Sequence, residues 1–175
     1  MTTITTTRLT LRDIHLTDWP AFHQMLANDD VVRFLEYGPF DEFQTREWLA
    51  HVIVTKYDTP RRVYHLAIEL KEPTSVIGWI ALTTLAPTTR EWSLSFALQQ
   101  EQWGHGYMTE AVTVVVDYAW KELNAHRIYV EVDPANVAST RVIERCGFEV
   151  EGRHKEKQHI RGQWRDVLHY GTLHP

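Results

Sequence analysis

The sequence predicts an α+β fold with α/β layering, in which helices flank a mixed, mostly antiparallel sheet containing one splayed parallel strand pair. Three closely spaced strands between residues 63 and 98 indicate an antiparallel meander. The strand at 127–132 is reached through a long helix, which makes it parallel to the strand before that helix. Two strands joined at Arg161-Gly162 end the chain. Residues 1–175 are expected to form a single domain.

The N-terminal part begins with a strand and two helices. Residues 8–14 alternate apolar and polar side chains, which predicts a strand. A helix then runs to about Ala27, and its inward-facing residues are expected to be Phe22, Met25 and Leu26. Residues 31–40 are expected to be irregular. Asp41 caps a second helix that runs to about Tyr57.

The middle of the chain predicts three strands and a helix. Residues 63–70 and 76–84 form a hairpin around Pro73, and residues 91–98 add a third strand. The helix at 109–123 is apolar except for a narrow polar stripe, so it is expected to pack on the sheet. That stripe consists of Glu110, Thr113, Asp117 and Lys121.

The C-terminal part adds a strand, a helix and a hairpin. After the strand at 127–132, a helix is expected from Asn136 to Cys146. Gly147 follows as a left-handed C-terminal residue, which lets Phe148 fold back on Ile143. The final antiparallel pair starts near Val150, and its last strand is expected at 164–173.

Composition excludes several classes of function. The net charge of −5 argues against a general nucleic-acid binder, because such proteins carry a basic patch or stripe. No apolar run approaches a membrane span and no signal peptide is seen, so we expect a cytoplasmic protein without a membrane partner. The ten histidines lack metal-ligand spacing, so no metal site is expected. The lone Cys146 is expected to be a packing residue.

A Gly-x-Gly turn, Gly104 and Gly106, lies between the strand at 91–98 and the helix at 109–123. Close glycines let backbone N–H groups converge, and a helix N-terminus adds unpaired N–H groups and a positive dipole end. The turn therefore predicts an anion cradle, most often for a phosphate. The purely structural alternative is a glycine-rich strand-to-helix turn that binds no ligand.

A dinucleotide-binding fold is a rival interpretation, with Asp133 as the ribose-binding acid. Five residues separate the strand from the first glycine, and Thr109 replaces the third glycine of that fingerprint. Too little chain remains for the further parallel strands. These observations count against a dinucleotide site.

The second motif is residues 133–148, DPANVASTRVIERCGF. Asn136 as a helix cap with Ser139 three residues later is sufficient as a purely structural explanation, worth about 1 kcal/mol. Placed after a parallel strand, however, the same two residues would face the opening between splayed strands, opposite the glycine turn.

Together these motifs resemble the GNAT superfamily of acyl-CoA-dependent N-acyltransferases. The segments EQWGHGYMTEA, NVASTRVIERCGF and GRHKEKQHIRGQWRDVLHYGTL look like its Rim-type branch, which contains acetyltransferases of ribosomal-protein N-termini and of small amines. The resemblance covers nearly the whole chain. It implies that acetyl-CoA is the cosubstrate, that no metal is required and that the acceptor is an amine. It also implies that the protein is a monomer or a homodimer.

The resemblance also implies a role for each motif. It assigns the coenzyme A pyrophosphate to the backbone of Trp103, Gly104, His105, Gly106, Tyr107, Met108 and Thr109. It pairs the pantetheine arm with the strand residues Ser95, Phe96, Ala97 and Leu98, one of whose N–H groups polarises the thioester carbonyl. Asn136 would bind the pantetheine region, and Ser139 would lie near the sulfur and protonate the departing thiolate.

The general base is not assigned by the resemblance. Family members often carry a Glu near the start of the strand before the glycine turn, where this chain has Ser93. Glu91 lies two residues earlier on the same face and is one candidate, with Glu131 and a water chain as the others. Glu101 also stands where the superfamily often has Gln or Arg.

The leading hypothesis is therefore an acetyl-CoA-dependent N-acetyltransferase with Ser139 and Glu91 as its candidate catalytic residues. The acceptor is a protein N-terminal α-amino group, or alternatively a small amine such as an amino acid, polyamine or antibiotic. A sensor that binds acyl-CoA without turnover is the hypothesis from another class.

Overall fold

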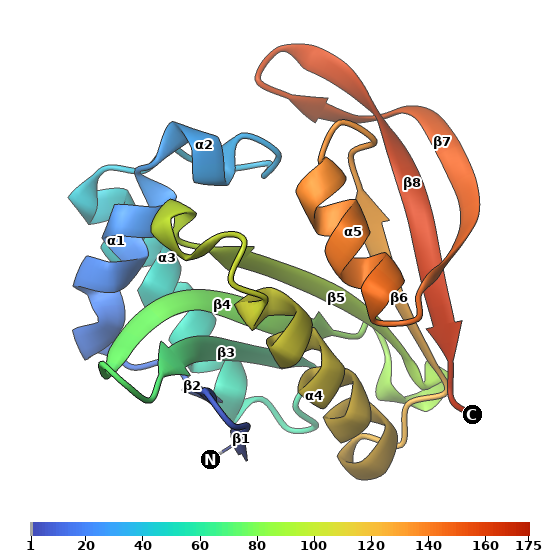
Figure 1. The fold of residues 1–175 in the computed structure, drawn as a ribbon, viewed down its shortest axis with the longest axis horizontal. Coiled ribbons are helices and arrows are strands. Elements are labelled where there is room, and N and C mark those ends of the chain that lie inside the picture. The colour runs from blue at the N-terminus through green and yellow to red at the C-terminus, as the bar shows by residue number, and fades with distance from the viewer. Residues whose placement is uncertain (1) are drawn as a thin grey trace.

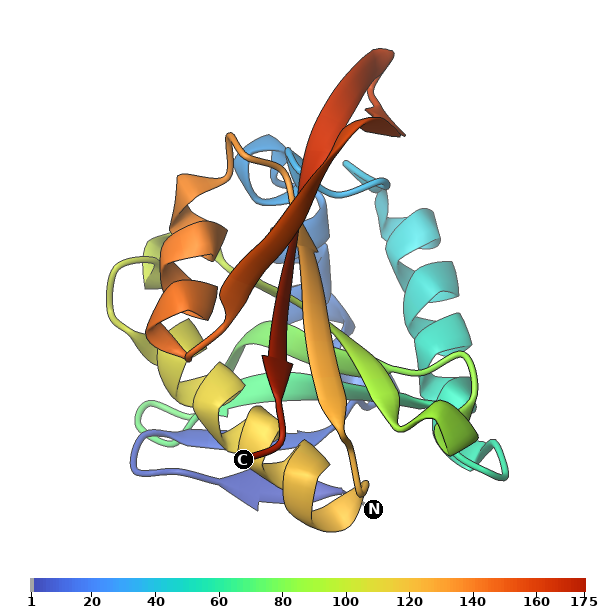
Figure 2. The same cartoon turned by 90° about the vertical axis from the view of Figure 1, so that its right-hand side faces the viewer.

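The computed structural model describes residues 2–175. In this part of the chain eight strands form one sheet in the order β1-β2-β3-β4-β5-β6-β8-β7. Helices cover both faces, as Figure 2 shows with the sheet between α3 on one side and α4 with α5 on the other. No helix within these residues is both long and apolar enough to span a lipid bilayer.

The first five strands form an antiparallel meander, which confirms the predicted run of strands (Figure 1). They are β1 (Thr3–Thr5), β2 (Leu9–Asp13), β3 (Val63–Leu70), β4 (Ser75–Thr83) and β5 (Glu91–Leu98). The sequence did not reveal β1, because it is three residues long and holds a single large apolar side chain, Ile4. Its backbone pairing with β2 maintains it instead.

Three helices follow β2 and cover one face: α1 (Trp19–Leu26), α2 (Asp29–Val32) and α3 (Glu42–Val54). The predicted inward residues of α1 are fully buried and pack on the sheet residues Ala67, Trp79 and Ala81. Asp41 caps α3 as predicted, since its side chain accepts the Gln44 N–H. The short helix α2 corrects the expectation that its last two residues belong to an irregular segment.

The other face is covered by α4 (Tyr107–Glu122) and α5 (Val137–Arg145). The buried residues of α4 pack on β2, β3, β4 and β5; they are Met108, Ala111, Val112, Val115 and Ala119. Gly147 has a φ of 82° and the Phe148 N–H donates to the Ile143 carbonyl at 3.1 Å, which confirms the predicted helix end.

The strand β6 (Arg127–Val132) lies between α4 and α5 in sequence and pairs with β5 in parallel. The chain ends in β7 (Glu149–Ile160) and β8 (Gln163–Leu173), joined at Arg161-Gly162 as predicted. Their hairpin projects beyond the rest of the sheet (Figures 1 and 2). Short 3₁₀ helices occupy Leu16–Asp18, Thr55–Tyr57, Pro87–Thr89 and Gln100–Gln102.

Candidate functional site

The parallel strands β5 and β6 separate after three registered pairs. Glu91 pairs with Arg127, and the last pair is Ser93 with Tyr129. Beyond it β5 continues to pair with β4 as far as Leu98, but not with β6. One edge of Ser95–Leu98 therefore offers backbone N–H and C=O groups to an extended ligand. Ser95 is exposed although it lies on a central strand, as the opening requires.

The glycine turn lies immediately beyond this opening. Gly104 and Gly106 have φ values of 80° and 78°, and Gly106 is the N-cap of α4. The helix therefore begins at Tyr107, two residues earlier than predicted. Its first N–H groups have no preceding turn to accept them, and the residues from Trp103 to Gly106 are exposed. A Cβ at Gly104 would meet no atom of residues 2–175 within 4 Å, so the turn borders open space in this part of the chain.

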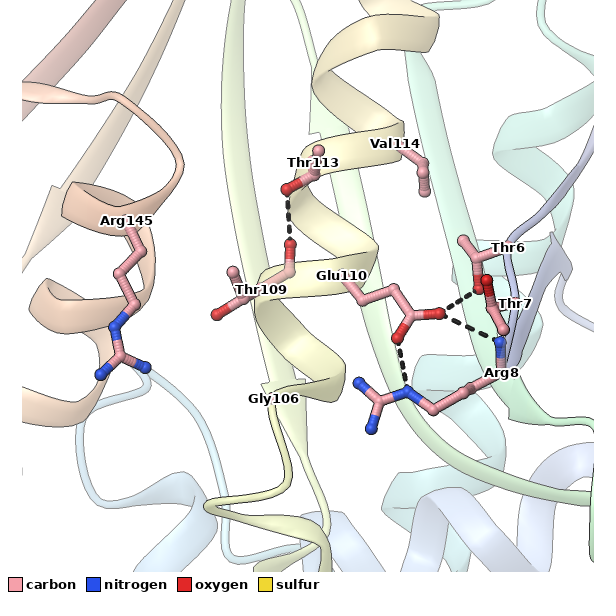
Figure 3. A pocket seen from close by; sticks show the side chains of 9 residues that line it. All are labelled: Thr6, Thr7, Arg8, Gly106, Thr109, Glu110, Thr113, Val114 and Arg145. Atoms are coloured by element: carbon pink, nitrogen blue, oxygen red, sulfur yellow. Dashed lines mark hydrogen bonds and ion pairs between the residues drawn. The ribbon is translucent and has the colours of Figure 1, made fainter.

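A pocket of about 750 Å³ lies over the first turns of α4, as Figure 3 shows. It is lined by Thr6, Thr7, Arg8, Gly106, Thr109, Glu110, Thr113, Val114 and Arg145. We call it the α4 pocket. Two predicted residues, Gly106 and Thr109, line it, but the two arginines at its sides were not predicted from the sequence. Helix N-terminal N–H groups and two guanidinium groups make this a surface for an anion.

The start of α5 lies across the opening from β5. The Asn136 side chain accepts the Ser139 backbone N–H at 3.2 Å, so the structural explanation of this pair as a helix cap holds. The Ser139 hydroxyl, half-buried, has no hydrogen-bond partner within residues 2–175 and is free to contact a ligand.

Cys146 lies between α4 and α5 and is half-buried. Its Sγ is 3.6 Å from the Thr109 carbonyl oxygen and 3.8 Å from the Thr113 hydroxyl. Burial raises the pKa of its thiol above the ordinary value, which disfavours the nucleophilic thiolate. This environment fits the predicted packing role.

On the face of the sheet opposite α4 and α5, charged side chains line the strands around the opening. At its closed end, Glu91 accepts from Arg127 Nε at 2.9 Å, and the other guanidinium nitrogens of Arg127 pair with Glu151. Glu131 lies two residues past the last registered pair, where it pairs with Lys157 and faces His169 Nε2 at 3.8 Å. Glu91 and Glu131 thus occupy the closed end and the open part of the same face.

A smaller pocket of about 160 Å³ lies on this face beside the closed end. It is lined by Thr83, Leu85, Thr89, Glu91, Ser93 and Tyr129, and we call it the Tyr129 pocket. The described part of the chain holds no group of three or more acidic, His or Cys side chains arranged for a metal ion.

A family model described as an acetyltransferase (GNAT) domain matches residues 8–149, which include both strands of the opening, the glycine turn and α5. The chain belongs to the GNAT acetyltransferase family. Membership makes it an acetyl-CoA-dependent N-acetyltransferase, and it confirms the resemblance found in the two motifs.

Similar proteins align with almost the whole of this GNAT chain. An uncharacterized N-acetyltransferase, p20 of Bacillus licheniformis, is 27% identical over 99% of this chain and 97% of its own. The structure of a ribosomal-protein-S5-alanine acetyltransferase from Vibrio fischeri superposes with a TM-score of 0.87 at 20% identity, covering 99% and 97% of the two chains. A spermidine N-acetyltransferase from Vibrio cholerae, solved with CoA and spermine, gives 0.82 at 24% identity over 96% of each chain.

Proposed function

We propose that this protein transfers the acetyl group of acetyl-CoA by direct attack of a primary amine, and that the amine is the N-terminal α-amino group of a protein. The observation that carries the proposal is the junction of the splayed β5 edge with the exposed glycine turn at the N-terminus of α4. An extended thioester arm and a pyrophosphate are joined in coenzyme A, and these two features are adjacent here.

The coenzyme is held by backbone groups. The N–H groups between Trp103 and Thr109 receive the pyrophosphate at the helix N-terminus. The free edge of Ser95–Leu98 pairs with the pantetheine arm, and one N–H donates to the thioester carbonyl. Asn136, already used as the α5 cap, contacts the pantetheine region.

The reaction forms one bond and breaks another. The amine nitrogen attacks the carbonyl carbon, and negative charge develops on the carbonyl oxygen, where a fixed backbone donor stabilises it. The carbon–sulfur bond then breaks as the amine proton passes to a base. Ser139, whose hydroxyl has no partner among the described residues, gives a proton to the departing thiolate.

Two carboxylates compete for the role of base. Glu91 is held by Arg127 in the closed part of the sheet, before β5 and β6 separate. Glu131 lies past the last registered pair, opposite the exposed Ser95, on the face from which an amine would approach. This placement supports Glu131 as the general base, acting directly or through water, more than it supports Glu91. The role of Glu91 stays a prediction.

The acceptor is the least constrained part of the proposal. Proteins of this fold include an enzyme named for a ribosomal-protein alanine and another named for spermidine. The β7–β8 hairpin, which projects beyond the body of the sheet, supports a polypeptide acceptor because it carries the exposed Trp164, whose ring centre lies 5.0 Å from that of His159. An aromatic side chain outside the core is a suitable contact for a peptide.

Thiol release from acetyl-CoA tests the proposal with a panel of acceptors. The panel pairs peptides that have free N-termini with the same peptides acetylated at the N-terminus, and adds spermidine and free amino acids. Turnover only with free peptide N-termini supports the protein acceptor, and turnover only with spermidine or amino acids replaces it with a small amine. Coenzyme binding without any turnover would indicate a sensor. Failure to bind coenzyme A overturns the proposal.

A further inference from the structure

Arg8 lies just before β2, yet its side chain reaches the first turn of α4 (Figure 3). Its Nε donates to Glu110 Oε2 at 2.7 Å, and its backbone N–H donates to Glu110 Oε1 at 3.1 Å. Thr6 Oγ1 donates to the same Oε1 at 2.5 Å. The loop between β1 and β2 is therefore bound to the start of α4 through one carboxylate.

The same guanidinium also holds the glycine turn. Arg8 Nη1 donates to the carbonyl oxygen of His105 at 3.0 Å, and the guanidinium carbon lies 4.5 Å from the centre of the Tyr107 ring. The His105 carbonyl and the Gly106 N–H belong to one planar trans peptide unit, so they point in opposite directions. Fixing the oxygen therefore fixes the direction of the Gly106 N–H.

Glu110 makes this contact electrostatically necessary. A carboxylate in the first turn suits the helix dipole, but it repels an anion bound at the same helix end. Burial raises the pKa of Glu110, and the hydrogen bonds from Thr6 and Arg8 outweigh that effect, so the pKa lies below its ordinary value and the group is ionised at neutral pH. Arg8 supplies the compensating charge.

We propose that Arg8 is a positioning residue of the coenzyme site, which orients the His105–Gly106 peptide for an anion and neutralises Glu110. The proposal rests on the proposed function, because the anion is the coenzyme pyrophosphate. Arg8 Nη2, which has no hydrogen-bond acceptor within residues 2–175, lies beside the turn: a Cβ at Gly106 would be 3.7 Å from it, and both residues line the α4 pocket.

The test compares two acetyl donors, acetyl-CoA and S-acetylpantetheine, because only the first contains the pyrophosphate. Arg8→Ala is expected to raise KM for acetyl-CoA by about 10-fold, the effect of losing charge-assisted hydrogen bonds. The kcat/KM for S-acetylpantetheine is expected to stay unchanged. A residue that only stabilised the fold would affect both donors alike.

Two further variants separate geometry from charge. Arg8→Lys keeps the charge but carries all its N–H donors on one nitrogen, so it cannot bridge Glu110 and His105 as Nε and Nη1 of Arg8 do, and it is expected to stay defective with acetyl-CoA. Adding Glu110→Gln to Arg8→Ala is expected to recover part of the affinity, because the uncompensated carboxylate is removed.

Arg46→Ala is the matched control, since Arg46 also combines an ion pair, to Glu42 at 3.8 Å, with a cation–π contact, to Trp19. It lies on α3, on the other face, and is expected to leave both donors unaffected. Wild-type affinity for acetyl-CoA in Arg8→Ala, full rescue by Lys, or equal losses with both donors would overturn the proposal. Absence of coenzyme A binding by the wild-type protein would instead overturn the proposed function beneath it.

Discussion

Ser93 and Tyr129 form the last registered pair between β5 and β6, and both line the Tyr129 pocket. β5 and β6 are paired from Glu91 up to this pair, and beyond it the two strands separate. The candidate coenzyme edge, the exposed Ser95 and the carboxylate of Glu131 all come from residues just beyond this pair. The pair therefore marks the boundary between the paired part of the two strands and the part that we propose to be reactive.

Gly106→Ala is expected to weaken coenzyme A binding by about 10-fold or more, measured by calorimetry. The positive φ strains any residue with a Cβ, by roughly 1–2 kcal/mol, and shifts the N–H groups of the turn. Gly162→Ala is the matched control, because Gly162 has a φ of 77° at the far β7–β8 turn. It should lose similar stability and keep its coenzyme affinity. If Gly106→Ala bound coenzyme A as tightly as Gly162→Ala does, the cradle would lie elsewhere.

Ser139→Ala and Asn136→Ala are expected to separate catalysis from capping. Asn136 uses its side chain to cap α5, whereas Ser139 contributes only its backbone N–H to that bond. Asn136→Ala should therefore lower the free energy of unfolding by about 1 kcal/mol, while Ser139→Ala should leave it unchanged. Ser139→Ala should lower kcat by about 10-fold or more, as loss of general acid catalysis does. An unaltered kcat would leave Ser139 with a structural role alone.

Glu131→Gln and Glu91→Gln test the two candidate bases in parallel. Loss of a general base lowers kcat by about 100-fold and removes the acidic limb of the pH profile for kcat. We expect this outcome for Glu131→Gln. Glu91→Gln should lower kcat only to the extent that losing the ion pair with Arg127 disturbs the closed end of the opening. The reverse result would assign the base to Glu91, and small effects from both variants would favour a water chain.

Asp13→Ala is expected to lower the free energy of unfolding by about 3 kcal/mol in urea titrations, because it leaves Arg61 without its buried partner. Asp13 is 3% exposed and accepts from Arg61 Nη2 at 2.7 Å and from the Thr2 N–H at 2.9 Å. Burial raises its pKa, but these bonds bring the pKa below the ordinary value of 3.8.

The stabilisation from Asp13 is therefore complete above that ordinary pKa and is lost as the pH falls through the lower folded-state pKa. Asp117→Ala is the control, since Asp117 forms an exposed pair with Lys121. It should change stability by less than about 0.5 kcal/mol. A comparable loss in both variants would contradict the role of burial.

His65 is expected to make the protein less stable as the pH falls from 6.5 toward 3. Burial lowers its pKa from 6.5 to about 3, and its Nε2 has no hydrogen-bond partner within residues 2–175. Between these values the unfolded chain binds a proton that the folded chain does not, so stability falls by up to about 1.4 kcal/mol per pH unit. His65→Phe should flatten this slope in urea titrations from pH 6.5 to 5. An unchanged slope would mean that another group titrates.

Local patterns predicted most of the fold because they depend on neighbouring residues. The alternation in β2, the apolar surface of α4 and the Gly147 helix end are all properties of short segments. The predicted start of α4 is two residues late, because a glycine N-cap carries no side-chain signal.

The site was less accessible to sequence reasoning because its supporting contacts join distant segments. The Arg8–Glu110 ion pair links residues from opposite halves of the chain, and the local patterns that contain them, a strand alternation and a polar helix stripe, do not indicate that they meet. Arg145 reaches the α4 pocket only because α5 packs beside α4. By contrast, Asn136 and Ser139 lie on one helix turn, so their contact could be anticipated from spacing.

Arg127 fixes the closed end of the opening by joining three strands, since it pairs with Glu91 on β5 and Glu151 on β7 while lying on β6. The hydrogen bonds and charge of Arg127 also hold the pKa of Glu151 below its ordinary value, so the bridge persists at moderately acidic pH. We therefore expect any widening of the opening to occur as a rotation of the strand ends beyond the last registered pair, about this fixed point. Such a rotation would change the width of the opening between β5 and β6 while their registered part stays unchanged.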